Sequence, residues 1–152
     1  MSGGKQVSVA IIGAGFIREY HIDGIRAAGG ADITTLVGRN LSKTKQRAEE
    51  LQIAKASVDF DTVLQDPMIE GVVIATPDAT HKPLAIAALD AGKCVLLQKP
   101  MAMNTGECGE IIAAAERSSA RLSVSFMHRY FPEVRWLREQ IDKKAFGKIH
   151  SV

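Results

Sequence analysis

The sequence is poor in aromatic residues, with five Phe, two Tyr and one Trp among 152 residues. Hydrophobic residues nevertheless make up 46% of the chain, so aliphatic side chains must build the core. This length suits one domain, which can bury a core without help from disulfides or metals. The composition is typical of a single α/β domain.

Neither sign of charge dominates, because 19 Lys and Arg face 17 Asp and Glu and the net charge is only +2. A protein that binds nucleic acid backbones usually has a larger basic excess, so we expect no nucleic acid partner. No apolar run approaches the roughly 20 residues of a membrane helix. Residues 1–5 lack the apolar core of a signal peptide. We therefore expect no membrane partner, and a flexible tail over residues 1–5.

Cysteine is also scarce. Cys94 and Cys108 form no C-x-x-C pair, and no His, Asp or Glu lies near them at the spacing of metal ligands. A disulfide framework or a zinc site is therefore not indicated. The sequence predicts no metal and a reducing, cytoplasmic setting.

Short apolar runs alternate with amphipathic stretches along the chain. The first run, 7–12, is apolar except for Ser8 and ends at a glycine, which is typical of a strand buried on both faces. We expect further strands near 33–37, 56–58, 71–75, 93–97 and 121–126. We expect helices near 16–28, 42–52, 61–65, 82–91, 105–118 and 132–147, with Ser42 and Asn104 as the N-caps of the second and fifth helices. This alternation predicts a doubly wound parallel sheet in three layers, the Rossmann fold, over 6–147.

A glycine-rich turn joins the first strand to the first helix. Gly13 permits a tight turn, and Gly15 leaves room for a pyrophosphate to approach the backbone. The helix that begins near Phe16 and Ile17 offers unpaired N–H groups to an anion. Arg18 stands where the usual motif has its third glycine. The turn predicts dinucleotide binding, and the alternative is a purely structural turn.

The end of the second strand indicates which dinucleotide binds. An Asp or Glu there would bind the ribose 2'-hydroxyl of NAD, but this sequence has Arg39, Ser42 and Lys43. A guanidinium can bind a 2'-phosphate through two parallel hydrogen bonds. The sequence therefore predicts NADP as the preferred cofactor and leaves NAD open. Alternatively, Arg39 and Lys43 only cover a solvated loop.

Further motifs follow at strand ends, namely His21 on the first helix, A-T-P-D-A-T-H at 75–81, Q-K-P at 98–100 and H-R-Y-F-P at 128–132. In this order, over essentially the whole chain, they resemble the cofactor-binding domain of the Gfo/Idh/MocA family (glucose-fructose oxidoreductase, inositol dehydrogenase and rhizopine catabolism proteins). The resemblance implies an NAD(P)-binding Rossmann domain followed by a substrate domain that is absent here. Residues 148–152 would be the opening strand of that second domain.

The resemblance implies roles for the first two motifs. Thr76 and Pro77 would line the cofactor, and His81 would cap the next helix close to it. Alternatively, Pro77 is a turn proline and His81 is a helix-start histidine with satisfied hydrogen bonds. His21 is expected to pack the first helix on the sheet.

The resemblance also implies a catalytic residue. Lys99 would lie beside the nicotinamide ribose and the reacting hydroxyl, where it can donate and accept a proton. Gln98 replaces the acid that is usual in the family, and the bond before Pro100 would be cis. Arg129 could contact the cofactor from the last strand end, and Met127 stands where an asparagine is common.

These residues predict the cofactor-binding domain of an NADP-dependent oxidoreductase that acts on a sugar, a cyclitol or a related hydroxyl or carbonyl substrate. Because the family's second domain supplies most substrate contacts, we expect the isolated chain to bind cofactor with little turnover. A homo-oligomer is compatible with this reading. The alternative is a stand-alone nucleotide-binding or redox-sensing module without catalysis.

Overall fold

The computed structural model describes residues 6–13 and 15–151, so the tail expected at 1–5 lies outside the described residues, as does Ala14. Strands and helices alternate as predicted. The strands are β1 (Val7–Ile12), β2 (Ala31–Val37), β3 (Lys55–Ser57), β4 (Gly71–Ile74), β5 (Cys94–Gln98) and β6 (Leu122–Ser125). The α-helices are α1 (Ile17–Ala28), α2 (Leu41–Glu50), α3 (Asp61–Gln65), α4 (His81–Asp90), α5 (Thr105–Arg117) and α6 (Pro132–Asp142), with short 3-10 helices η1 (Asp78–Thr80) and η2 (Met127–Tyr130).

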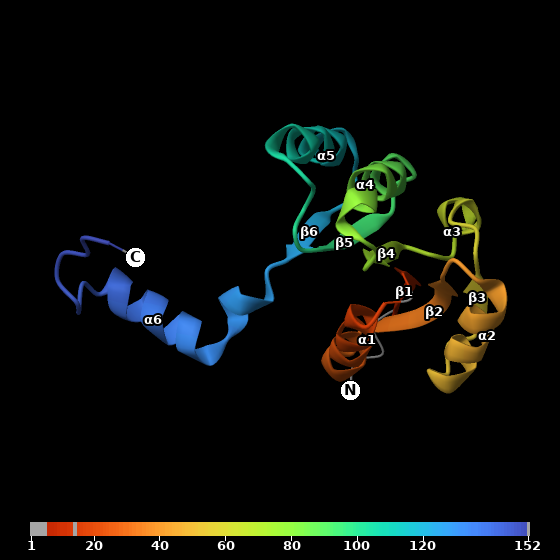
Figure 1. The fold of residues 1–152 in the computed structure, drawn as a ribbon, viewed down its shortest axis with the longest axis horizontal. Helices are drawn as coiled ribbons and strands as arrows, with labels where there is room; N and C mark the ends of the chain where they lie inside the picture. Colours follow the sequence, from red (N-terminus) through yellow and green to blue (C-terminus); the bar gives the residue numbers. More distant parts are fainter. Residues whose placement is uncertain (1–5, 14, 152) are drawn as a thin grey trace.

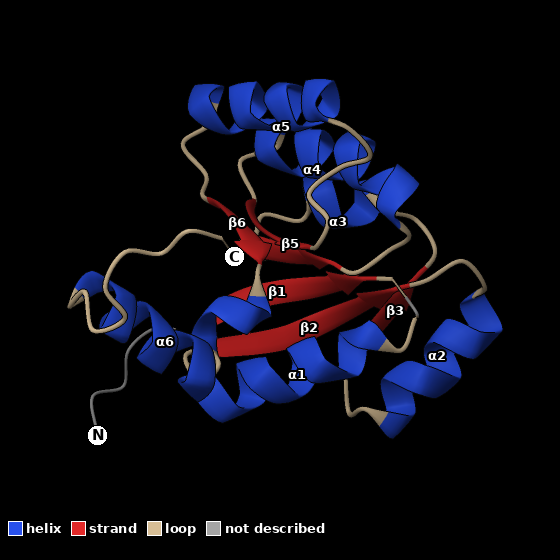
Figure 2. Ribbon diagram, turned by 60° about the vertical axis from the view of Figure 1, so that its left-hand side comes forward, coloured by secondary structure: helices blue, strands red, loops and turns tan. Residues whose placement is uncertain are grey.

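The six strands form one parallel sheet in the order β3-β2-β1-β4-β5-β6. The chain winds outward from β1 to β3, returns to pair β4 with β1, and then winds the other way. Helices α1 and α2 cover one face, and α3, α4 and α5 cover the other (Figure 2). The predicted three-layer, doubly wound fold is confirmed. In such a sheet the crevice for a ligand lies where the winding reverses, here between β1 and β4.

The side chains of successive residues in the central strands point to opposite faces of the sheet. Ile11 and Val73 pack with Ile22 of α1, whereas Ile12 and Ile74 belong to the larger cluster under α4 and α5. Both faces of β1 and β4 are therefore buried, which explains their continuous apolar runs. Among the described residues, the largest fully buried side chains include no Phe, Tyr or Trp, in line with the aliphatic core expected from composition.

The helix starts partly differ from expectation. Asn104 caps α5 as predicted, because its side chain accepts a hydrogen bond from the backbone N–H of Glu107 at 2.9 Å. The prediction that Ser42 caps α2 is wrong, because that helix begins at Leu41. Asn40 is the cap, because its extended backbone lets its side chain accept from the N–H of Lys43 at 3.0 Å.

Helix α6 ends earlier than predicted, at Asp142 rather than near Gly147. Lys144 adopts a left-handed conformation with φ of 57°, and the N–H of Ala145 donates to the carbonyl of Gln140 at 2.9 Å. This pattern closes a helix without glycine at the left-handed position. No residue of α6 is buried, and the helix stands off from the sheet (Figure 1). Residues 148–151 form no strand, contrary to expectation.

We predict that Gly13→Ala strongly destabilises the fold. Gly13 has φ of +118°, and a Cβ there would lie 2.4 Å from the backbone carbonyl oxygen of Ala75, the residue that follows β4. Strain and clash together should lower the free energy of unfolding by about 3 kcal/mol in a urea titration. Gly109→Ala on α5 is the control, because a Cβ there meets open space and should add about 0.5 to 1 kcal/mol. Equal stability of the two variants would contradict this account.

We also predict that His21 makes the fold sensitive to acid. Burial lowers the pKa of its imidazole, and within the described part of the chain its Nε2 has no hydrogen-bond partner. The unfolded chain takes up a proton near pH 6.5 while the folded chain resists it. This contribution to stability is complete above about pH 6.5 and is lost as the pH falls toward the lowered pKa.

The measurement is the melting temperature between pH 7.5 and 5.5. His21→Gln should flatten its dependence on pH, whereas His128→Gln, in the exposed η2, should leave it unchanged. An unchanged slope in the His21 variant would refute the assignment.

Candidate functional site

A hollow of about 640 Å³ lies at the carboxyl ends of β1, β2 and β4. Its volume is within the usual range of ligand sites. We call it the crevice, and its lining is Ile12, Gly13, Gly15, Phe16, Ile17, Val37, Gly38, Arg39, Val58, Ala75, Thr76 and Pro77. The structure thus brings together seven of the residues predicted to bind a cofactor, from three separate segments of the chain. Gly38 and Val58 also line it, although no motif had marked them.

Gly13 fixes the floor of the crevice. Its N–H donates to the carbonyl of Val37 at 2.9 Å, and the N–H of Ala75 donates to the carbonyl of Ile12 at 2.8 Å. The backbone of Ala75 leaves no room for a Cβ on Gly13, so only glycine fits between the ends of β1 and β4. The crevice therefore opens directly above the point where the winding of the sheet reverses.

Gly15 faces open space, because a Cβ built there would meet no described atom within 4 Å. Helix α1 follows, and the side chain of its N-cap residue, Phe16, forms no capping hydrogen bond. The N–H groups of Arg18 and Glu19 lie 3.3 and 3.2 Å from carbonyl oxygens of the same turn, Gly15 and Phe16. Room at Gly15 and weakly bonded N–H groups at a helix start are what a pyrophosphate requires.

A second hollow of about 590 Å³ lies beside the crevice. We call it the basic hollow, and its lining is Arg18, Arg39, Asn40, Lys43, Thr44, Gln46, Arg47 and Glu50. Arg39 belongs to both hollows, so it marks the place where they meet. Ser42 lies in the first turn of α2, outside the residues that line either hollow.

The charges on Arg18 and Arg47 are partly balanced within the basic hollow. Arg18, in place of the third glycine, is only 6% exposed, and burial, followed by the nearby Arg47, lowers the pKa of its guanidinium. Arg47 hydrogen-bonds to Glu50 and Glu19, which raises its own pKa. Sequence reasoning overlooked Arg47, although it lies one helical turn after Lys43.

Arg39 and Lys43 are not part of the ion-pair network of Arg18 and Arg47. Neither forms an ion pair with another described residue, although both line the basic hollow. They are therefore the cations available to an incoming anion beside the crevice. This is the position expected of groups that bind a ribose 2'-phosphate.

His81 lies beneath the crevice rather than in its lining. It is fully buried, and its ring nitrogens face two backbone carbonyl oxygens, with Nδ1 2.8 Å from that of Pro100 and Nε2 3.0 Å from that of Thr76. The geometry matches the reading of a helix-start histidine that is hydrogen-bonded to the backbone. The imidazole ties the loop of Thr76 to the loop that follows Lys99.

Lys99 follows β5, the strand beside β4, and is not among the residues that line the crevice. The bond between Lys99 and Pro100 is cis, as the resemblance implied. Gln98 is 5% exposed, and its Oε1 accepts a hydrogen bond from the backbone N–H of Lys99 at 2.8 Å. Gln98 therefore holds the backbone of this loop rather than facing a ligand. Lys99 is exposed and lines a third hollow of about 300 Å³, which we call the lysine hollow.

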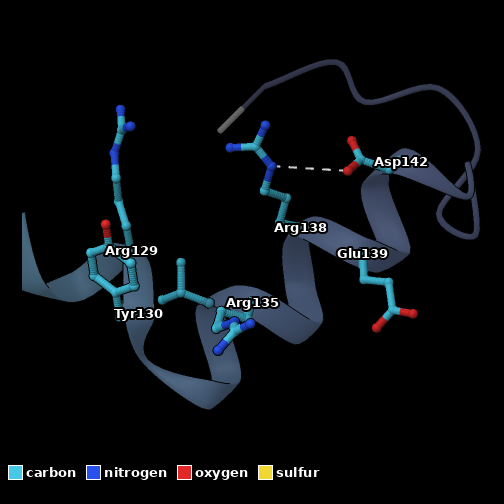
Figure 3. Close-up of a pocket in the computed structure, with 7 residues that line it drawn as sticks. Arg129, Tyr130, Arg135, Arg138, Glu139 and Asp142 are labelled. Atoms are coloured by element: carbon cyan, nitrogen blue, oxygen red, sulfur yellow. Dashed lines mark ion pairs between the residues drawn. The ribbon is translucent and has the colours of Figure 1, made fainter. Parts of the chain in front are cut away.

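Arg129 shares a hollow with Lys99 and does not line the crevice at the glycine turn. It lines the lysine hollow, and its guanidinium carbon lies 5.5 Å from the centre of the Phe126 ring. It also borders a hollow between η2 and α6, where it extends to the same side as Arg138 (Figure 3). Arg138 is paired with Asp142 there at 3.9 Å.

Among residues 6–13 and 15–151, no group of three His, Cys, Asp or Glu side chains could hold a metal ion. In the same part of the chain, no helix is long and apolar enough to cross a membrane.

Comparisons with known proteins agree with this geometry. Mouse trans-1,2-dihydrobenzene-1,2-diol dehydrogenase is 32% identical over 117 residues, which are 77% of this chain and 35% of that protein. The scyllo-inositol 2-dehydrogenase (NAD(+)) of Bacillus subtilis is 31% identical over 144 residues, 94% of this chain and 42% of that protein. Levoglucosan dehydrogenase in complex with NADH and levoglucosan has a TM-score of 0.89 at 26% identity, over 95% of this chain and 41% of its own.

The chain therefore spans less than half the length of these relatives. The family model described as "Oxidoreductase family, NAD-binding Rossmann fold" matches residues 7–126. Together with the crevice at the glycine turn, this match shows that the chain belongs to the Gfo/Idh/MocA oxidoreductase family and contains its NAD-binding Rossmann domain.

Proposed function

We propose that the chain is the cofactor-binding part of an NADP-dependent oxidoreductase. The substrate would be a sugar, a cyclitol or a related molecule whose reacting carbon bears a hydroxyl or carbonyl group. The observation that carries this proposal is the crevice, which gathers the glycine turn, Arg39 and the Thr76 loop at the reversal point of the sheet. The named dehydrogenases among the relatives support the reaction class.

The residues of the crevice fit a nicotinamide dinucleotide. Gly15 leaves the space that a pyrophosphate needs, and the weakly bonded N–H groups that follow it would bind that anion. Arg39 and Lys43 would bind a 2'-phosphate, while Thr76 and Pro77 line the crevice. When bound, the cofactor supplies the hydride chemistry, and the protein supplies binding, orientation and proton transfer.

Lys99 is the residue that we assign to proton transfer. Its Nζ would accept the hydroxyl proton when the substrate is oxidised and return it when the carbonyl is reduced. Gln98 and His81 act on its position, because one bonds the N–H of Lys99 and the other faces the carbonyl of Pro100.

The chain on its own should bind cofactor with little turnover. The named relatives are more than twice its length, and the lysine hollow is small and open on the surface of the described residues. Binding of NADPH in a calorimetric titration, without oxidation of polyols by the same preparation, is the expected result. A chain that fails to bind either dinucleotide would contradict the proposal, and rapid polyol oxidation would contradict the part on turnover.

We predict that Gly15→Ala weakens cofactor binding without weakening the fold. A methyl group there meets no described atom within 4 Å but occupies the space proposed for the pyrophosphate. The dissociation constant for NADPH should rise at least tenfold, equivalent to about 1.4 kcal/mol, while the melting temperature stays within a degree or two. Gly109→Ala is the matched control and should leave the dissociation constant for NADPH unchanged, while the helix stabilisation described above raises its melting temperature. An unchanged dissociation constant in the Gly15 variant would remove the glycine turn from the site.

We predict that the chain prefers NADPH to NADH and that Arg39 causes the preference. Removing a charge-assisted hydrogen bond costs about 1.5 to 3 kcal/mol, so Arg39→Ala should weaken NADPH binding by about tenfold to a hundredfold and NADH binding much less. Arg117→Ala is the control, because Arg117 forms an exposed ion pair with Asp90 on another face, at 3.8 Å. Fluorescence titration of both cofactors measures the ratio. Equal or tighter binding of NADH by the unaltered chain would refute the preference.

A further inference from the structure

The basic hollow contains a carboxylate among its cations. Four cationic side chains line it, namely Arg18, Arg39, Lys43 and Arg47, whereas Glu50 is the one acid among the described residues of the lining. A carboxylate repels the 2'-phosphate that is proposed to bind there. Glu50 therefore affects how strongly the basic hollow attracts that phosphate.

Arg47 lies between two carboxylates that come from different helices. Its Nη1 donates to Oε2 of Glu50, on the same helix α2, and its Nη2 donates to Oε1 of Glu19 on α1. Each terminal nitrogen of the guanidinium thus holds one carboxylate. Arg47 can offer Nη1 to a ligand in the same geometry only if the carboxylate of Glu50 moves away.

The two carboxylates are held differently. Glu19 also faces the guanidinium of Arg18 at 3.7 Å, and the side chain of Arg18 is only 7% exposed. A buried cation that loses its acid is strongly destabilising, so Glu19 must keep its place. Glu50 is 43% exposed, and its Oε1 accepts from Nε2 of Gln46 at 3.2 Å on the same helix. An exposed ion pair adds little stability, because water solvates both partners, so Glu50 can leave Arg47 at small cost.

Arg47 also has the right place on α2 to meet a phosphate. It follows Lys43 by four residues, so the two side chains are neighbours on one face of the helix. Side chains on a helix lean toward its N-terminus, which directs Arg47 toward the turn that carries Lys43 and toward Arg39 before it. A phosphate monoester has three terminal oxygens and a charge of about −1.5 to −2, which attracts a guanidinium more strongly than one carboxylate does.

We infer that a 2'-phosphate replaces the carboxylate of Glu50 on Nη1 of Arg47, while Glu19 keeps Nη2. One charge-assisted hydrogen bond is broken and another is formed, and the released carboxylate returns to water. Arg47 is then the third cation of the phosphate site, and Glu50 is an internal competitor that limits the preference for NADP. The inference rests on the proposed function and adds two specificity-determining residues to it.

The first test removes the competitor. Glu50→Gln should lower the dissociation constant for NADPH at least threefold and change that for NADH by less than a factor of two, in fluorescence titrations at fixed ionic strength. Glu49→Gln is the matched control, because it removes the same charge from the same helix at an exposed residue outside the lining of the hollow. The control should leave the ratio of the two dissociation constants unchanged. An unchanged or lower preference for NADPH in the Glu50 variant would overturn the inference.

The second test removes the cation. Arg47→Gln should raise the dissociation constant for NADPH at least fivefold and that for NADH by less than a factor of two. Binding of NADH shows that the crevice of the variant is intact. Lys45→Gln is the control, since Lys45 is an exposed cation of α2 outside the lining. If Arg47 only ties α2 to α1, its variant will melt earlier with an unchanged NADPH to NADH ratio, and the inference is overturned.

The double variant distinguishes exchange on Arg47 from simple repulsion by Glu50. If Glu50 acts by occupying Arg47, Glu50→Gln should lose most of its threefold gain when Arg47→Gln is already present. If Glu50 acts only through its own charge, the full gain will persist in the double variant. That result would overturn the exchange.

The failure of the inference can be told from the failure of the proposed function. If the unaltered chain binds NADPH no more tightly than NADH, the proposed cofactor preference fails and the inference fails with it. If the unaltered chain prefers NADPH but the Glu50 or Arg47 variant keeps the same ratio, only the inference is overturned.

Discussion

The close approach of two backbones, at Gly13 and Ala75, is the constraint on which the site depends. It brings the end of β1 against the end of β4, where the winding of the sheet reverses. The glycine turn, the Arg39 loop and the Thr76 loop then face one another across the crevice. A side chain at Gly13 would force these ends apart, so the fold and the crevice share one requirement.

A second set of contacts links the crevice to Lys99, the proposed proton-transfer residue. The imidazole of His81 lies between the carbonyls of Thr76 and Pro100, so the crevice and the lysine hollow are joined by one buried side chain. Gln98 adds a bond to the N–H of Lys99 from within the sheet. The backbone around Lys99 is thus held from both sides, although its amine remains exposed.

The fold and the crevice could be predicted from sequence because they depend on periodicity and on glycine, which are local signals. The cap of α2 could not, since Asn40 and Ser42 are both good capping residues and only the backbone conformation selects one. The end of α6 could not be predicted, because a lysine, Lys144, adopts the left-handed conformation that a glycine usually marks in the sequence. The burial of Arg18 and Gln98 depends on side chains distant in sequence, so the resemblance alone could not show which way they face.

Helix α6 has no buried residue, and this has a consequence for cooperativity. The sheet and helices α1 to α5 share two aliphatic clusters, so they must unfold together. Helix α6 is outside both clusters, and an isolated helix of 11 residues is only marginally stable in water. The described chain therefore has two levels of local stability, and the backbone amides of α6 can exchange with solvent without any opening of the domain.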